Sequence, residues 1–215
     1  MDLRGCIFDL DGVIVDTAKY HFLAWKRLAQ ELGFEFTEHD NEALKGVSRV
    51  ASLEILLRIG GIAKTEKEKN ELATRKNNWY VDYISHMTPA EILPGSLELL
   101  KALRREGILT GIGSASKNAM MILDRIEITD LFDVIVDGNK IHTAKPDPEV
   151  FIRSAEDMKL TADTCIVFED ARAGVEAALA AGMKCVGVGN PVSLKKAHIV
   201  VPDLKNITIQ QLRNL

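Results

Sequence analysis

Five short stretches of apolar, largely β-branched residues recur along this chain, and segments with helical periodicity lie between them. The apolar stretches span residues 3–10, 109–114, 132–137, 164–168 and 184–188, and the helical segments span residues 95–106, 117–125, 148–158 and 173–181. Runs of strand length with little apolar/polar alternation are typical of parallel strands covered on both faces. The alternation predicts an α/β fold with a doubly wound, Rossmann-like parallel sheet.

A long helical segment interrupts this alternation after the first strand. Residues 16–85 contain no strand-like run, and Thr17, His21 and Trp25 are spaced so that they share one helix face. A crossover between parallel strands needs only about a dozen residues. We therefore predict an α-helical cap domain over residues 16–89, inserted into a catalytic core made of residues 1–15 and 90–215.

Two pairs of acidic residues follow strand-like runs. Asp9 and Asp11 end the first run, and Glu169 and Asp170 end the fourth. The carboxyl ends of strands in an open α/β sheet form its binding crevice, so we expect all four carboxylates there. Such a cluster needs a cation, and oxygen ligands alone favour Mg²⁺. The alternative for each pair is an ordinary acidic turn at the end of a strand.

Two further segments supply groups that bind anions. The segment Ser114 to Asn118 follows the second strand and opens a helix, where hydroxyl and backbone N–H groups can bind phosphate. Alternatively, Ser116 is only a helix N-cap. Lys145 precedes a proline, which restricts its backbone to extended conformations. We expect this stiffened lysine to lie in the acidic crevice and balance phosphate charge, and the alternative is an ordinary solvated loop lysine.

The order of these motifs resembles that of the haloacid dehalogenase-like phosphotransferases, in their phosphoglucomutase-like branch with a helical cap. The set is DLDG at 9–12, Ser114, Lys145 and the acidic pair at 169–170. Further segments that resemble this branch span residues 8–29, 44–53, 75–80, 114–118 and 144–151. The resemblance covers the whole chain, although Ala171 stands where the family often has serine or threonine.

The resemblance implies a role for each core motif. Asp9 is the expected nucleophile and Asp11 the expected general acid/base, with Ser114 and Lys145 completing the catalytic set. The implied Mg²⁺ ligands are Asp9, Asp11 through its backbone carbonyl, Glu169 and Asp170.

The resemblance also implies a set of substrate-binding residues, most of them in the cap. Arg49 suits a second phosphate because its guanidinium can bind two oxygens at once. His21 and Trp25 have the alternative of packing on their helix face. The implied set comprises Thr17, His21, Trp25, Lys45, Gly46, Val47, Ser48, Arg49, Ser52, Lys76, Ala115, Ser116, Lys117 and Asn118.

The expected reaction is the interconversion of β-D-glucose 1-phosphate and glucose 6-phosphate through an aspartyl-phosphate and a sugar bisphosphate. A sugar-phosphate phosphatase with the same core is the main alternative, and a non-catalytic sugar-phosphate sensor is a third. The segments 45–49 and 114–118 favour the mutase, because a phosphatase has no need for a second phosphate site.

The composition argues against several classes of binding partner. The net charge of -4 gives no broad attraction for nucleic acid or anionic lipid, and no apolar run reaches the ~18–20 residues of a membrane span. Three widely spaced cysteines, each inside an apolar run, suggest buried thiols. We expect a cytoplasmic monomer that acts on small sugar phosphates.

Overall fold

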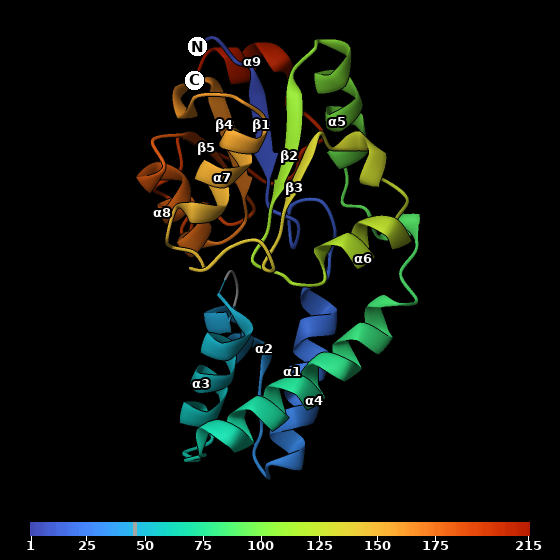
Figure 1. The fold of residues 1–215 in the computed structure, drawn as a ribbon, viewed down its shortest axis with the longest axis vertical. Helices are drawn as coiled ribbons and strands as arrows, with labels where there is room; N and C mark the ends of the chain where they lie inside the picture. The colour runs from blue at the N-terminus through green and yellow to red at the C-terminus, as the bar shows by residue number, and fades with distance from the viewer. Residues whose placement is uncertain (45–46) are drawn as a thin grey trace.

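The computed structural model describes residues 1–44 and 47–215, which form an α/β body and a helical body (Figure 1). Six parallel strands make one sheet in the order β3-β2-β1-β4-β5-β6. The strands are β1 Gly5–Phe8, β2 Leu109–Gly113, β3 Val134–Val136, β4 Cys165–Glu169, β5 Lys184–Val188 and β6 Ile199–Val201. The strand order reverses between β1 and β4, so the predicted doubly wound parallel sheet is confirmed.

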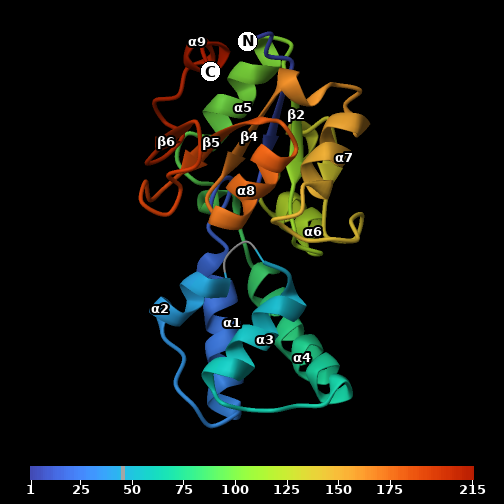
Figure 2. The same ribbon diagram turned by 90° about the vertical axis from the view of Figure 1, so that its left-hand side faces the viewer.

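Helices cover both faces of the sheet. Helices α5 (Ser96–Arg105) and α6 (Ala119–Arg125) pack on one face, and α7 (Glu149–Asp157) and α8 (Arg172–Ala180) pack on the other. Figure 2 shows α5 and α7 on opposite sides of the strands. Each face buries its own apolar cluster, which explains why the strand sequences do not alternate between apolar and polar residues.

Two elements of the α/β body were missed by sequence analysis. Strand β6 has three residues, all half-buried, at the edge of the sheet. Helix α9 (Ile209–Arg213) has five residues and begins at a capping box between Thr208 and Gln211. Both elements are too short to give a recognisable hydrophobic period.

The helical body consists of α1 (Ala18–Glu31), α2 (Glu38–Asn41), α3 (Arg49–Ile59) and α4 (Glu66–Ile84). The Ser48 hydroxyl accepts a hydrogen bond from the Ala51 N–H at the start of α3, and the helix ends at Gly60. A separate apolar cluster, which includes Trp25 and Leu56, holds these helices together. The inserted helical cap is thus confirmed as part of the fold, while the domain boundaries at residues 16 and 89 stay a prediction.

Two antiparallel chain segments connect the bodies. Val15 pairs with Ile92, and the Leu93 N–H donates to the Ile14 carbonyl at 2.9 Å. The paired linkers place the start of α1 and the end of α4 together under the carboxyl edge of the sheet (Figure 1). Among the described helices, none is long and apolar enough to cross a membrane.

Gly95, at the start of α5, lies against the C-terminal segment and gives a test of that packing. Its φ is +89°, and a Cβ built there would lie 2.6 Å from the Lys205 Cα and closer still to the Leu204 carbonyl carbon. Gly95→Ala should therefore lower the free energy of unfolding by about 2–4 kcal/mol, from left-handed strain and overpacking together. Chemical denaturation measures the loss.

Gly33 provides the matched control, because its φ is +87° but nothing lies within 4 Å of a Cβ built there. Gly33→Ala should lower the free energy of unfolding by only about 1 kcal/mol. Equal losses in the two variants would contradict the packing of the C-terminal segment on Gly95.

Candidate active site

The two acidic pairs lie next to each other at the carboxyl ends of β1 and β4. Phe8 and Phe168 are partners in the parallel ladder, and the Asp9 N–H donates to the Phe168 carbonyl at 2.9 Å. Their aromatic rings stack with centroids 4.5 Å apart. The pairing places Asp9 beside Glu169, the last residue of β4, at the position where the strand order reverses.

A buried lysine connects these two strand ends. Lys145 Nζ lies 2.5 Å from Asp9 Oδ1 and 2.7 Å from Glu169 Oε1, and the Lys145 side chain is 1% exposed. Burial alone would lower the pKa of Lys145, but the charges of Asp9 and Glu169 outweigh it and raise the pKa. The lysine thus stays charged and offsets the repulsion between the two carboxylates.

Asp11 lies where the core meets the cap. Burial, and then the charge of Asp9, raise the pKa of Asp11 to about 6, against opposing effects from Thr17 and two lysines. Thr17 precedes α1, but its side chain does not cap the helix; its hydroxyl donates to Asp11 Oδ1. A carboxyl group with a pKa near neutrality can both accept and release a proton, as a general acid/base must.

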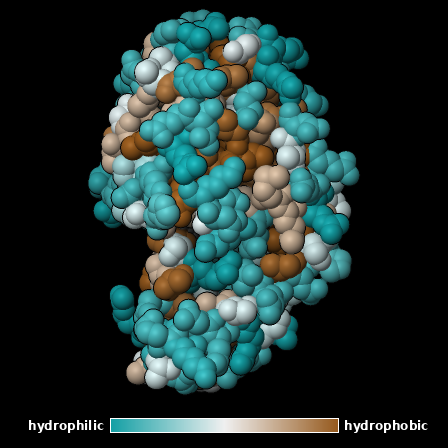
Figure 3. All heavy atoms as spheres, in the orientation of Figure 1, coloured by the Kyte–Doolittle hydropathy of each residue, from teal (hydrophilic) through white to brown (hydrophobic). Residues whose placement is uncertain are grey.

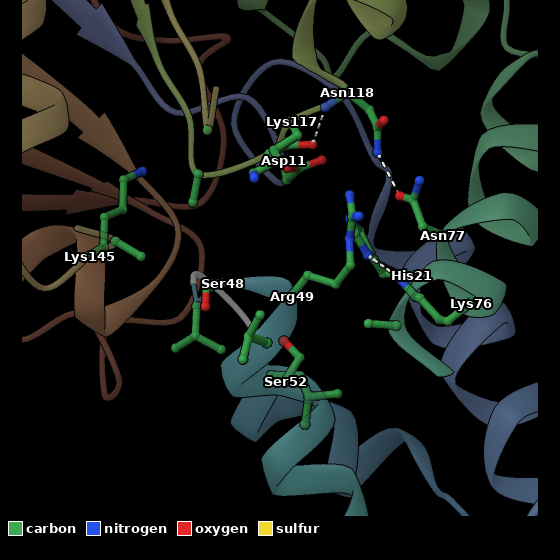
Figure 4. Close-up of a pocket in the computed structure, with 18 of the residues that line it drawn as sticks. Asp11, His21, Ser48, Arg49, Ser52, Lys76, Asn77, Lys117, Asn118 and Lys145 are labelled. Carbon is green, nitrogen blue, oxygen red and sulfur yellow. Dashed lines mark hydrogen bonds between the residues drawn. The ribbon is translucent and has the colours of Figure 1, made fainter. Parts of the chain in front are cut away.

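A cavity of about 460 Å³ lies between the two bodies. The molecular outline is indented between them in the space-filling view (Figure 3). In the close-up, Arg49, His21 and Lys76 of the cap face Asp11, Lys117 and Lys145 of the core across the cavity (Figure 4). The lining includes most of the predicted site residues: Asp9, Asp11, His21, Trp25, Val47, Ser48, Arg49, Ser52, Lys76, Ala115, Ser116, Lys117, Asn118, Lys145 and Asp170.

The remaining predicted residues have other positions. Ser114 is 1% exposed, does not line the cavity, and accepts a hydrogen bond from the Ser116 N–H at 3.1 Å. Thr17 and Glu169 are also buried outside the lining, each in contact with a residue that lines it. Lys45 and Gly46 lie outside the described residues, so their predicted substrate contacts stay predictions.

The cap end of the cavity concentrates positive charge. Lys76 is 2% exposed, and its Nζ lies 2.8 Å from His21 Nδ1 and 4.5 Å from the Trp25 ring centroid. Burial, and then the charge of Arg49, lower the pKa of Lys76 to about 7. Burial, followed by the charges of Lys76 and Arg49, lowers the pKa of His21 well below its usual value. An anion at this end of the cavity would therefore be stabilised by Arg49 and Lys76.

Asn77 was missed by sequence analysis. It lines the cavity from α4, and its Oδ1 accepts a hydrogen bond of 3.1 Å from the Asn118 side-chain amide, across the gap between cap and core (Figure 4). Asn118 is the residue before α6, and its side chain makes no cap hydrogen bond. The alternative of Ser116 as the N-cap of this helix is therefore wrong, because α6 starts at Ala119. No sequence signal separates Asn77 from its exposed neighbour Asn78.

Some of the acidic residues at this site are placed where they could bind a hard divalent cation. Asp9 and Asp170 both line the cavity, and a Cβ built on Gly12 would meet the Asp170 carboxylate, so the loop after β1 lies against Asp170. Glu169 has different contacts: its Oε1 accepts from Lys145 and its Oε2 from the Ala171 N–H at 2.6 Å. Within residues 1–44 and 47–215, no three His, Cys, Asp or Glu side chains are already grouped around a metal position. Asp9 and Asp170 thus offer oxygen ligands suited to Mg²⁺, whereas a metal role for Glu169 stays a prediction.

Comparisons with known proteins identify the family. The family model for haloacid dehalogenase-like hydrolases matches residues 6–188, so the chain belongs to that family, as the sequence resemblance predicted. The chain is 44% identical over 212 residues to a β-phosphoglucomutase of Bacillus subtilis, covering 98% of this chain and 94% of the relative. A crystal structure of β-phosphoglucomutase from Clostridium difficile superposes with a TM-score of 0.94 at 42% identity, over 99% of this chain and 96% of that one.

A relative with a different activity is also similar. The phosphorylated carbohydrates phosphatase of Thermotoga maritima is 29% identical over 217 residues, covering 99% of this chain and 98% of the relative. Relatives that align with nearly the whole chain therefore include both a mutase and a phosphatase.

The two buried lysines predict opposite effects on stability. Lys145 neutralises two carboxylates, so Lys145→Met leaves uncompensated buried charge and should lower the free energy of unfolding by about 3–5 kcal/mol. Lys76 is buried beside another cation, so Lys76→Met should raise it by on the order of 1–3 kcal/mol at pH 7. Denaturant unfolding without substrate measures both, and Lys67→Met, at an exposed position of α4, serves as the control.

The size of the Lys76 effect also depends on pH. Its pKa of about 7 in the folded protein is below the usual lysine value of 10.5, so folding releases a proton between these values. The stabilisation by Lys76→Met should be fully present below pH 7 and vanish as the pH rises towards 10.5. A loss of stability in Lys76→Met comparable to that in Lys145→Met would contradict the two environments described.

Proposed function

We propose that this chain is a β-phosphoglucomutase, which interconverts β-D-glucose 1-phosphate and glucose 6-phosphate through β-D-glucose 1,6-bisphosphate. The 44% identity to the Bacillus subtilis β-phosphoglucomutase over nearly the whole chain supports the reaction. The observation that carries the proposal is a cavity with cationic side chains at both ends, Lys145 and Lys117 from the core and Arg49 from the cap. A bisphosphate has two charged ends and matches this arrangement, and a 460 Å³ cavity is large enough for a small molecule.

Asp9 is the proposed nucleophile. Its carboxylate attacks phosphorus, the bond from phosphorus to the sugar oxygen breaks, and Asp11 delivers a proton to that oxygen. In the reverse half-reaction a sugar hydroxyl gives its proton to Asp11 and attacks the aspartyl-phosphate. Lys145 stabilises the charge on the transferring group, and a bound Mg²⁺, held by Asp9, Asp170 and the Asp11 carbonyl, would neutralise phosphate charge.

The second phosphate site gives the cap its proposed role. Arg49, at the first turn of α3, binds the phosphate that does not react while the other phosphate is at Asp9. After the first transfer the bisphosphate turns round, so the same two sites must accept either end. Closure of the cap over the sugar keeps water from the aspartyl-phosphate, which selects the sugar hydroxyl as acceptor.

A sugar-phosphate phosphatase is the rival function, favoured by the similarity to the Thermotoga maritima phosphatase. Both functions use the same nucleophile and differ in the acceptor, which is a sugar hydroxyl in one and water in the other. The products therefore separate them.

The function is tested by incubating the protein with Mg²⁺, β-glucose 1-phosphate and a trace of the bisphosphate. We expect glucose 6-phosphate as the main product, with turnover abolished by chelation of the metal or by Asp9→Asn. Inorganic phosphate in stoichiometric excess over glucose 6-phosphate would identify a phosphatase instead.

The second phosphate site is tested by Arg49→Ala. Loss of its guanidinium should raise KM for β-glucose 1-phosphate by about 10–100-fold, because charge-assisted bonds to a phosphate contribute on the order of 1.5–3 kcal/mol. The matched control is Arg58→Ala, at an exposed position near the other end of α3, which should leave KM unchanged. An unchanged KM in Arg49→Ala would contradict the assignment.

A further inference from the structure

Tyr80 of α4 is a buried side chain that the sequence analysis did not single out. It is 0% exposed, and its ring stacks on His21 with centroids 4.0 Å apart and an angle of 25° between the planes. Lys76 Nζ lies 4.7 Å from the centre of the same ring. The ring is thus fixed within the cationic end of the cavity wall.

The hydroxyl of Tyr80 is not satisfied. Across residues 1–44 and 47–215 it is the one buried side-chain nitrogen or oxygen atom that lacks a hydrogen-bond partner. Burying a hydroxyl without a partner costs about 1–3 kcal/mol, and a phenylalanine would fill the same space without that penalty. The penalty suggests that the hydroxyl gains a partner in another state of the protein.

The groups around the hydroxyl indicate which partner it gains. Burial, and then the negative charge of Asp11, raise the pKa of Tyr80 well above its usual value, while a hydrogen-bonding approach to the Thr17 side chain lowers it. The Thr17 hydroxyl donates a hydrogen bond to Asp11 Oδ1, and its oxygen keeps lone pairs that can accept a hydrogen bond from another donor. A small approach of Tyr80 would therefore complete a chain in which Tyr80 donates to Thr17 and Thr17 donates to Asp11.

We propose that Tyr80 is a positioning residue for Asp11, whose hydroxyl donates to the Thr17 hydroxyl and so extends the Thr17–Asp11 hydrogen bond when substrate is bound. Tyr80 and Thr17 both belong to the cap, so this bond is made within the cap and reaches Asp11 of the core through the hydrogen bond that Thr17 already donates. The chain of hydrogen bonds would orient the Asp11 carboxylate towards the sugar oxygen. This inference rests on the proposed role of Asp11 in phosphoryl transfer.

The test is Tyr80→Phe, which removes only the hydroxyl. We expect kcat to fall about tenfold with KM changed by less than twofold, because the hydroxyl acts after substrate has bound. The midpoint of thermal unfolding should stay the same or rise, since the buried hydroxyl has no partner in this state. Tyr83→Phe is the matched control, because Tyr83 lies on the same helix, half-buried, and should change neither quantity.

A double-mutant cycle with Thr17→Val tests whether Tyr80 acts through the proposed chain. If it does, adding Tyr80→Phe to Thr17→Val should lower kcat little further. A kcat of Tyr80→Phe within twofold of the parent chain, or fully additive losses in the cycle, would overturn the inference.

The test of Tyr80 and the test of the proposed function have separate readouts. The product made by the parent chain, glucose 6-phosphate or inorganic phosphate, decides the function. The ratio of kcat between Tyr80→Phe and the parent decides the role of Tyr80, and it applies to either reaction because Asp11 protonates the leaving oxygen in both.

Discussion

The buried ion pairs of Lys145 are the interaction on which the site depends. Two parallel strands bring Asp9 and Glu169 side by side in a region that excludes water, where like charges repel strongly. Lys145 contacts both carboxylates, so one cation neutralises the repulsion and ties the segment before α7 to the ends of β1 and β4. The resulting wall is rigid and charged, and it leaves the Asp9 carboxylate at the edge of the cavity.

The cap contributes the opposite half of the cavity. Its own apolar cluster packs α1, α3 and α4 together. Two paired linkers connect the cap to the core, and Ala24, Tyr80 and Ile84 of the cap pack in the larger core cluster. Hydrogen bonds between cap and core at the cavity include Thr17 with Asp11 and Asn77 with Asn118. Hydrogen bonds of this kind exchange readily with those of a phosphorylated sugar, so binding and closure can be linked energetically. A cap that closes on the substrate makes the acceptor selective for a sugar hydroxyl over water.

Sequence was sufficient to predict the core because its signals are local. Strand runs, the acidic pairs that end two of them and the lysine before a proline are each read from consecutive residues, and the topology then brings them together. The Ser48 cap and the Gly60 end of α3 were predictable for the same reason. Strand β6 and helix α9 were not, because three and five residues carry no period and tertiary contacts determine their structure.

The sequence also could not predict which side chains meet across the cavity. Asn77 and Asn78 are identical residues on one helix, and only the rotation of α4 against the core decides which of them meets Asn118. The sequence placed Glu169 at a strand end but could not show that its two oxygens accept hydrogen bonds from Lys145 and the Ala171 amide, and its metal role stays a prediction. The unsatisfied hydroxyl of Tyr80 is likewise a property of the packed structure, since periodicity predicts only that its ring is buried.

The central claim is that Asp9 carries the phosphoryl group. Rapid acid quenching of the protein with isotopically labelled sugar bisphosphate, followed by digestion and mass spectrometry, locates the adduct directly. The account predicts an acid-stable but alkali-labile phosphoryl group on the peptide that contains Asp9, which disappears when unlabelled glucose 1-phosphate is added. Label on any other residue, or turnover without a labelled protein, would contradict it.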